Sequence, residues 1–221
     1  MPSKARTAEL LRDLIAHVPV HEAARATVLG FLDGADRHYH GLAHVALLWA
    51  RHLQFSVGTA LAADTPTRLI ACAIAYHDAI YDPTRRDNEA RSAALWRDHA
   101  APGPMPATEV DWVTETIIAT SDHFGQTKGG HSWASARTWL LDLDLTPLGE
   151  TADDFTRNTA LLRAEYAHLA EPEWVAGRAA FLASLARHPM LFRTPILHDR
   201  FEAAARRNIA AALESLRQGP V

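Results

Sequence analysis

Apolar residues recur at spacings of three and four along most of this chain. The pattern is clearest in Leu11, Leu14 and Val18, in Val110, Val113 and Ile117, in Phe155, Leu162, Tyr166 and Leu169, and in Phe201, Ala205, Ile209, Leu213 and Leu216. This spacing places apolar side chains on one face of an α-helix. No stretch combines strict apolar and polar alternation with β-branched residues, the pattern of a half-buried strand. The sequence therefore predicts an all-α fold.

Helix-breaking residues mark the joints between these segments. They are Pro19, Gly34, Gly58, the PGPMP cluster at 102–106, the GQTKGG stretch at 125–130, Pro147 with Gly149, Pro172 and Pro195. The glycine-rich loop at 125–131 suits a plain connector slightly better than a mobile flap. No internal repeat or long linker divides the chain. With 221 residues, 48% of them hydrophobic, we expect one compact domain over residues 1–221.

The N-terminal sequence, the single cysteine and the net charge bear on location and partners. The first residues contain Glu9 and Asp13 between short apolar stretches and lack the apolar core of a signal peptide. Cys72 lies in an apolar run, so there is no disulfide framework or cysteine-based zinc cluster. The apolar runs are too short to cross a bilayer. We expect a cytoplasmic protein without a membrane partner, and a charge of -4 argues against general nucleic-acid binding.

The adjacent pair His77-Asp78 follows the apolar run LIACAIAY. Thr65-Pro66 predicts the start of the preceding helix, with Thr65 as N-cap, so the pair is expected at the C-terminal end of a buried helix. Two polar groups are costly to bury without a partner. A metal ion could be that partner, or His77 could interact with the helix dipole while Asp78 accepts a backbone or arginine donor.

Histidines and carboxylates elsewhere could complete a metal site. His40 and His44 are spaced by four, which would place both on one face of a helix opening near Tyr39. Asp142 and Asp144 lie among leucines, and their spacing of two makes them diverge on a helix, so one of them is expected to act as a cap. Imidazole and carboxylate ligands suit Mn, Mg, Fe, Co, Ni or Zn. Six other histidines show no partner pattern and are expected at surfaces or caps: His17, His21, His52, His168, His188 and His198.

The order His44, His77-Asp78, Asp144 resembles the H…HD…D signature of HD-superfamily metal-dependent phosphohydrolases. The stretches RHYHGLAHV, YHDAIYDPTRRDNEARSA, IIATSDH, LDLDLTPLG, RAEYA and AARRNIAAAL are similar to successive blocks of one bacterial branch. The resemblance covers about Arg37 to Leu213. It implies a helical HD-type domain with a metal-binding core at about 37–148, on which C-terminal helices at 152–217 pack.

The same resemblance implies the site residues. His44, His77, Asp78 and Asp144 would ligate a divalent metal, with Asp142 in support or as a cap. Some HD nucleotidases carry a proton donor one turn after the pair, where this chain reads Ala79, Ile80, Tyr81 and Asp82. The acid or base candidates are therefore Glu89 and His123, with Asp82 beside them. Glu89 is equally well explained as an exposed carboxylate at a helix start, after Asp87 or Asn88 as cap.

Basic side chains near the expected site suggest a phosphorylated substrate. Arg37, Arg85 and Arg86 are candidates for phosphate binding, and His40 for orienting the substrate or a ligand. We expect hydrolysis of a phosphomonoester or pyrophosphate bond in a small phosphorylated metabolite such as a nucleotide. A second metal near His99, His123 and His131 would fit the alternative of a di-iron oxygenase. The remaining alternative is a regulator that binds nucleotide or metal without turnover.

Overall fold

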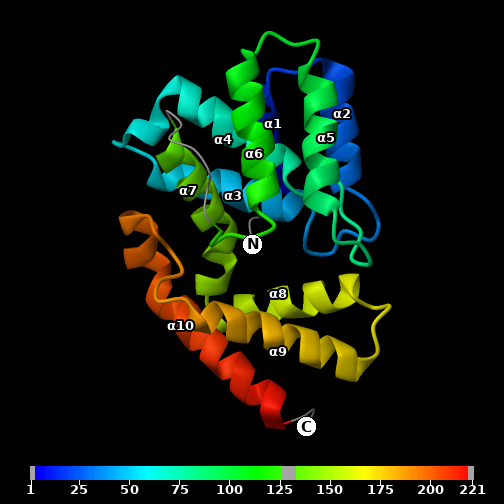
Figure 1. Cartoon of the computed structure of the whole chain (residues 1–221), viewed down its shortest axis with the longest axis vertical. Helices are drawn as coiled ribbons and strands as arrows, with labels where there is room; N and C mark the ends of the chain where they lie inside the picture. Colours follow the sequence, from blue (N-terminus) through cyan, green and yellow to red (C-terminus); the bar gives the residue numbers. More distant parts are fainter. Residues whose placement is uncertain (1–2, 126–132, 219–221) are drawn as a thin grey trace. The chain divides into compact units, whose positions relative to one another are not determined.

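All regular secondary structure in the described part of the chain is helical, which confirms the all-α prediction (Figure 1). The computed structural model describes residues 3–125 and 133–218, so His131 and most of the glycine-rich loop lie outside it. The α-helices are α1 (Lys4–Ala16), α2 (Glu22–Leu32), α3 (Leu42–Phe55), α4 (Asp64–Tyr76), α5 (Asn88–Ala100), α6 (Ala107–Ala119), α7 (Ala134–Leu145), α8 (Ala152–Glu165), α9 (Glu171–Arg187) and α10 (Pro195–Gln218). Two 3-10 helices, η1 (Ala60–Ala62) and η2 (Thr146–Gly149), complete the order.

The helices form two compact units, Met1–Leu141 and Asp142–Val221. The boundary falls inside α7, which is one continuous helix from Ala134 to Leu145. A single HD-type domain over the whole chain stays a prediction. No helix within the described ranges is long and apolar enough to span a membrane.

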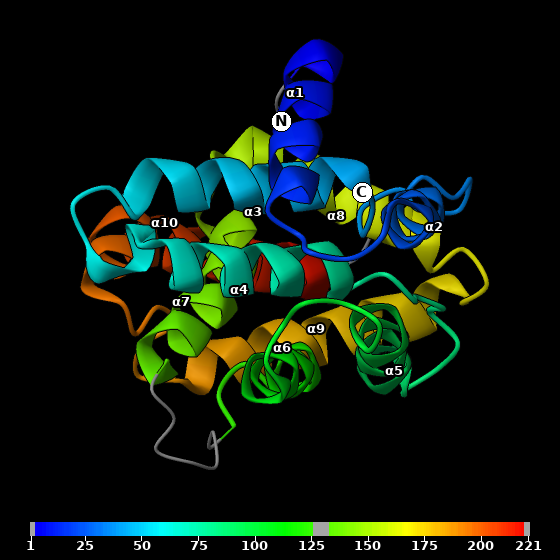
Figure 2. The same cartoon turned by 90° about the horizontal axis from the view of Figure 1, so that it is seen from above.

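The C-terminal half of helix α4 is buried in the first unit. Every residue from Leu69 to Tyr76 is buried, because α1, α3, α5 and α6 all contact this helix. Figure 2 shows α3 and α4 side by side, and Figure 1 shows the α5–α6 pair. The helix begins at Asp64 with Ala63 as its N-cap, so the prediction of Thr65 as cap was wrong. Its end at Tyr76 agrees with the predicted end just before His77-Asp78.

The turn from α2 to α3 is packed too closely for a side chain at position 41. A Cβ on Gly41 would lie 2.9 Å from the Leu32 carbonyl oxygen and 3.2 Å from the Arg37 Cβ. Helix α3 begins only at Leu42, so the prediction of a helix opening near Tyr39 was wrong. His40 therefore lies in the turn and does not share a helix face with His44.

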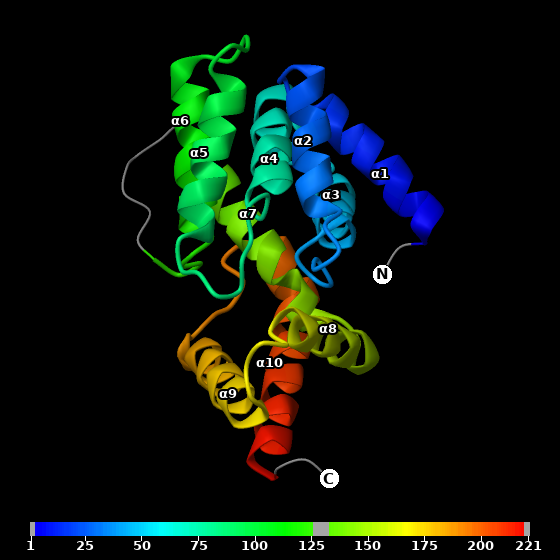
Figure 3. The ribbon, with the colours of Figure 1, turned by 90° about the vertical axis from the view of Figure 1, so that its right-hand side faces the viewer.

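In the second unit, α10 packs against η2 and α9, and Figure 3 shows the α9–α10 pair. Phe201, Ala205 and Ile209 of the predicted apolar stripe are buried in α10 together with Leu197, whereas Leu213 and Leu216 are half-buried. The Asn208 side-chain amide donates to the carbonyls of Leu148 and Glu150, and so ties the C-terminal end of η2 to α10.

Candidate metal centre

His77 lies where α4 ends. It is the C-cap residue of this helix, its backbone N–H donates to the Ala73 carbonyl at 2.9 Å, and its side chain is buried. The free carbonyls at a helix C-terminus favour a nearby positive charge. The predicted position of His77 at the end of a buried helix is therefore also one where a cation is favoured.

A backbone hydrogen bond fixes which nitrogen of His77 faces the site. Nδ1 lies 3.0 Å from the Ile74 carbonyl oxygen, and since a carbonyl only accepts, Nδ1 must carry the proton. In the neutral ring, Nε2 is then the nitrogen that can bind a metal. The same arrangement orients metal-binding histidines, whose second nitrogen donates to a carbonyl or carboxylate.

Three ligand atoms of the first unit meet at this point. The His77 Nε2 atom lies 3.4 Å from His44 Nε2 and 3.0 Å from an Asp78 carboxylate oxygen, and the same oxygen lies 3.8 Å from His44 Nε2. His44 comes from the first turn of α3 and is buried. The site thus unites the end of α4 with the start of α3.

Asp78 is held in its charged form. Burial alone would raise its pKa, but the imidazoles of His77, His40 and His44 and a hydrogen bond from His77 hold the pKa well below its usual range. The carboxylate is therefore ionised near neutral pH and able to act as a ligand.

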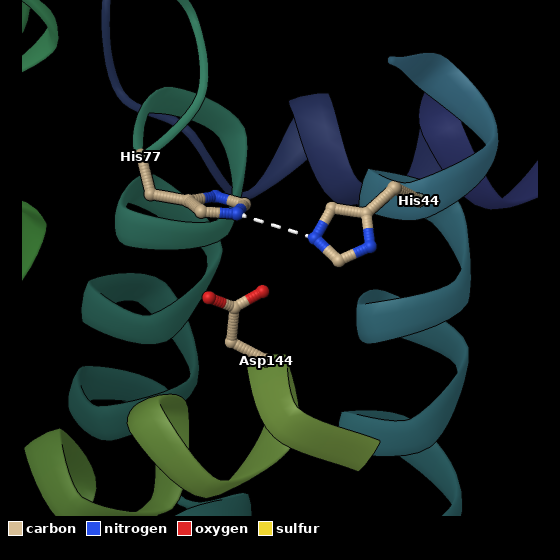
Figure 4. A group of neighbouring side chains, drawn as sticks. All are labelled: His44, His77 and Asp144. Atoms are coloured by element: carbon tan, nitrogen blue, oxygen red, sulfur yellow. Dashed lines mark hydrogen bonds between the residues drawn. The ribbon is translucent and has the colours of Figure 1, made fainter. Parts of the chain in front are cut away.

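Asp144 forms a group with two of the other predicted ligands, His44 and His77. It lies on the last turn of α7, and one ligand atom from each of His44, His77 and Asp144 lies within 4.8 Å of the other two. Figure 4 shows both imidazole rings and the carboxylate directed toward one another. These three side chains could together hold a metal ion, and an Asp78 carboxylate oxygen lies within 3.8 Å of both histidine Nε2 atoms.

The donor set fits a divalent cation. Bonds of about 2.0–2.2 Å from a metal to nitrogen or oxygen place neighbouring ligand atoms about 3.0–3.4 Å apart. The His77–Asp78 and His77–His44 separations lie in that range. Two imidazoles with carboxylates suit Mn, Fe, Co, Ni or Zn. A metal that prefers sulfur would need thiolate ligands instead.

The Arg37 guanidinium donates hydrogen bonds to backbone carbonyls. Its Nη1 donates to the carbonyls of His40 (3.0 Å) and Asp78 (2.8 Å), and its Nη2 donates to the carbonyl of Ala79 (2.8 Å). Sequence reasoning expected Arg37 to meet a phosphate, whereas in the structure three of its donor contacts go to main-chain oxygens. This role was not visible in the sequence because Arg37 and Asp78 are 41 positions apart.

His40 lies beside the three ligand atoms and not among them. Its ring stacks on Tyr81 with centroids 4.2 Å apart, meets the edge of Tyr39 at 4.8 Å, and lies 6.2 Å from the His44 ring. Half-buried His40 and Tyr81 thus form an aromatic rim next to the centre. Sequence reasoning had proposed His40 but had missed Tyr39 and Tyr81, although both tyrosines fall in the RHYHGLAHV and YHDAIYDP blocks.

Two of the other predicted residues of the 82–89 segment, Asp82 and Arg85, have partners within the segment. One Asp82 carboxylate oxygen accepts from the backbone N–H and the hydroxyl of Thr84, which lowers the Asp82 pKa. Arg85 makes two 2.7 Å hydrogen bonds to Asp87. Arg86 is exposed, and Glu89 lies half-buried in the first turn of α5. Neither Asp82 nor Glu89 belongs to the ligand group of His44, His77 and Asp144.

The alternative of a second metal rests on His99, His123 and His131. His123 is half-buried, three residues beyond Thr120, the C-cap of α6, and it does not belong to the ligand group. The His99 Nδ1 atom pairs instead with the Tyr76 hydroxyl at 2.9 Å. His131 lies outside the described residues, so a second metal stays a prediction.

Asp142 has a structural role within the second unit. Its carboxylate is fully buried and accepts from the Thr194 backbone N–H at 2.6 Å and from Arg193 Nε at 3.4 Å. Both donors lie just before α10. Burial raises the Asp142 pKa above its usual value, and these hydrogen bonds and the Arg193 charge offset only part of that increase. Asp142 therefore fixes the backbone and side chain of the two residues before α10, and its predicted role as a cap or as support for the metal site stays a prediction.

Comparisons with family models, curated proteins and solved structures found no match for this chain. Any function assigned to it therefore comes from its own residues and their geometry. The structural basis for a functional assignment is the close approach of His44 Nε2, His77 Nε2 and the Asp78 carboxylate at the end of α4.

Proposed function

We propose that this chain is a divalent-metal-dependent phosphohydrolase of the HD superfamily. Its substrate would be a small phosphorylated metabolite, such as a nucleotide, with a phosphomonoester or pyrophosphate bond. The observation that carries the proposal is the approach of His44 Nε2, His77 Nε2 and the Asp78 carboxylate, with the His77 ring oriented by Ile74. The cytoplasmic location expected from the sequence stays a prediction.

His44, His77, Asp78 and Asp144 would hold the metal. When bound, a divalent ion supplies Lewis-acid polarisation of a phosphoryl oxygen and lowers the pKa of a coordinated water toward about 7. The hydrogen bond from His77 Nδ1 to Ile74 keeps the other ring nitrogen available as a ligand. The lowered pKa of Asp78 keeps its carboxylate charged over the working range of pH.

The aromatic rim of His40 and Tyr81 would orient the substrate. Stacked rings offer a flat surface for a nucleobase or another planar leaving group, and the His40 imidazole can donate to a phosphate oxygen. Arg86, which is exposed, remains the arginine of the 82–89 segment proposed to meet phosphate. Arg85 is less suited to that role because its guanidinium is paired with Asp87.

Glu89 and His123 remain the proposed proton donors. Asp82 is the weaker candidate. Hydrogen bonds from Thr84 lower the Asp82 pKa, so its carboxyl group is ionised near neutral pH and has no proton to donate.

The test is release of phosphate or pyrophosphate from a nucleotide panel by metal-stripped protein reloaded with Mn²⁺, Co²⁺, Zn²⁺ or Mg²⁺. We expect activity only with metal, and a loss of at least about a hundredfold in His77→Ala, since a bound ion contributes several kcal/mol to the transition state. The matched control is His38→Ala, an exposed histidine of the α2–α3 turn. Equal turnover in the presence of chelator, or full activity in folded His77→Ala, would rule the proposal out.

A further inference from the structure

The chain from Asp78 to Asp82 has no regular secondary structure, yet side chains hold its backbone from two sides. On one side Arg37 donates to the carbonyls of Asp78 and Ala79. On the other side α5 supplies Ser92 and Asn88. The position of the Asp78 carboxylate therefore depends on side chains that lie far from it in the sequence.

Two side chains of α5 each contact both the N–H group and the carbonyl of one residue in the 78–82 segment. The Ser92 hydroxyl accepts from the Ile80 N–H at 2.9 Å and lies 3.2 Å from the Ile80 carbonyl oxygen. The Asn88 amide accepts from the Asp82 N–H at 3.0 Å and donates to the Asp82 carbonyl at 2.9 Å. Ser92 and Asn88 are both buried and four residues apart, so they face the segment from one side of α5.

Arg37 is the charged member of this arrangement. A guanidinium offers donors in a rigid planar fork, and its hydrogen bonds are stronger than those between neutral groups. Its Nη1 atom also donates to the His40 carbonyl, and its Cζ atom lies 5.4 Å from the centre of the Tyr81 ring. Arg37 therefore connects the turn before His44 with the segment 78–81.

We propose that Arg37 is a positioning residue of the metal centre. By holding the carbonyls of Asp78 and Ala79, it keeps the Asp78 carboxylate against His77 Nε2 and His44 Nε2, and it does not serve as the phosphate-binding arginine. This inference rests on the proposed metal site. Outer residues that orient metal ligands typically change metal affinity or activity by 10- to 100-fold when replaced.

The test compares Arg37→Gln and Arg37→Lys with Arg91→Gln, an exposed arginine of α5. The metal-free full chain is titrated with Co²⁺, followed by its visible absorption, and the KM for a phosphorylated substrate is measured separately. We expect Arg37→Gln to weaken Co²⁺ binding about 10- to 100-fold, Arg37→Lys to recover part of the loss, and Arg91→Gln to match the wild type. Unchanged Co²⁺ affinity with a raised KM would overturn the proposal and identify Arg37 as a substrate contact.

Hydrogen exchange supplies a readout that needs no metal. In Arg37→Gln the amides of Ala79, Ile80 and Asp82 should exchange faster, while those in the middle of α3 keep their protection. Ser92→Ala, which releases Ile80 from the other side, should have the same local effect and serves if Arg37→Gln does not fold. Unchanged exchange at residues 79–82 in these variants would contradict the positioning role. A wild-type chain that binds no Co²⁺ would instead refute the proposed function and, with it, a role for Arg37 at a metal centre.

Discussion

The Trp139 indole N–H donates a hydrogen bond to His52 Nδ1 at 3.2 Å in the interior of the first unit. Sequence reasoning placed His52 at the surface or at a cap, and that prediction was wrong, since its side chain is 1% exposed. Trp49 stacks on the same imidazole. Burial, together with the nearby His17, lowers the pKa of His52 from 6.5 to about 4.

Stability should therefore fall in acid through His52. Between pH 6.5 and 4 the unfolded chain binds a proton at this residue that the folded chain excludes, so the free energy of unfolding decreases as pH falls. The full effect is roughly 3 kcal/mol, present above pH 6.5 and lost toward pH 4. Urea unfolding at a series of pH values should show a flatter dependence for His52→Gln than for the wild type. Parallel pH dependences of the two proteins, with exposed His38→Gln as the control, would contradict the prediction.

Metal binding should stabilise the chain through Asp78. An ion at about 100 times its Kd adds about 2.7 kcal/mol to the stability of the folded state. In wild-type protein stripped by chelator, added Co²⁺ should therefore raise Tm by several degrees. Asp78→Asn, which removes the charge and keeps the shape, should lose most of this increase, whereas Asp36→Asn on the exposed α2–α3 turn should retain it. An equal Co²⁺-dependent rise in Tm in all three proteins would show that Asp78 is not a ligand.

Gly149 should tolerate no side chain. A Cβ there would lie 2.7 Å from the Phe201 carbonyl oxygen and 2.8 Å from the Phe201 Cβ, where η2 packs on α10. Gly149→Ala should cost about 1–3 kcal/mol, as overpacking of a close contact does. Gly177→Ala is the matched control, because no atom lies within 4 Å of its added Cβ and alanine favours the α9 helix. In thermal unfolding, Gly149→Ala should lower Tm and Gly177→Ala should raise it. A Gly149→Ala variant as stable as the wild type would count against this packing.

The ion pair of Arg68 and Glu109 should contribute more than an exposed pair. Arg68 Nη2 lies 2.9 and 2.8 Å from the two carboxylate oxygens of buried Glu109, between α4 and α6. Arg68→Gln should cost about 1–3 kcal/mol, because Glu109 would remain buried without its charged partner. Arg97→Gln, which breaks a pair with Asp111 whose two side chains are about half exposed, should cost less than about 1 kcal/mol. Chemical denaturation of both variants makes the comparison, and equal costs would refute it.

Several features of the chain were predictable because they depend on neighbours in sequence. The three-and-four spacing of apolar residues predicted the helices, including the buried stripe of α10. The apolar run before His77 predicted a buried helix that ends at the His77-Asp78 pair. The HD-type order of residues selected His44, His77 and Asp144, whose ligand atoms the structure brings within 4.8 Å of one another.

Other assignments depended on contacts that sequence spacing does not encode. The spacing of four between His40 and His44 suggested one helix face, but α3 begins at Leu42 after the N-cap Gly41, so His40 lies in the preceding turn. Arg37 was a candidate for phosphate binding as a basic residue near the expected site, yet it bonds to carbonyls 41 and 42 positions away. Asp82 and Asp87 have their hydrogen-bond partners within two residues, which no helical or strand period reveals.

The sequence by itself thus determined the helical class, the end of α4 and the types of side chain available as ligands, because helix periodicity and residue chemistry are local properties. Only the tertiary structure decided which polar groups meet. It buried His52 beneath Trp139, and it placed Arg37 and Ser92 on the backbone around Asp78. Such choices follow from the hydrogen-bonding needs of backbone groups in loops, which are satisfied by whichever side chains the packing of distant helices brings near.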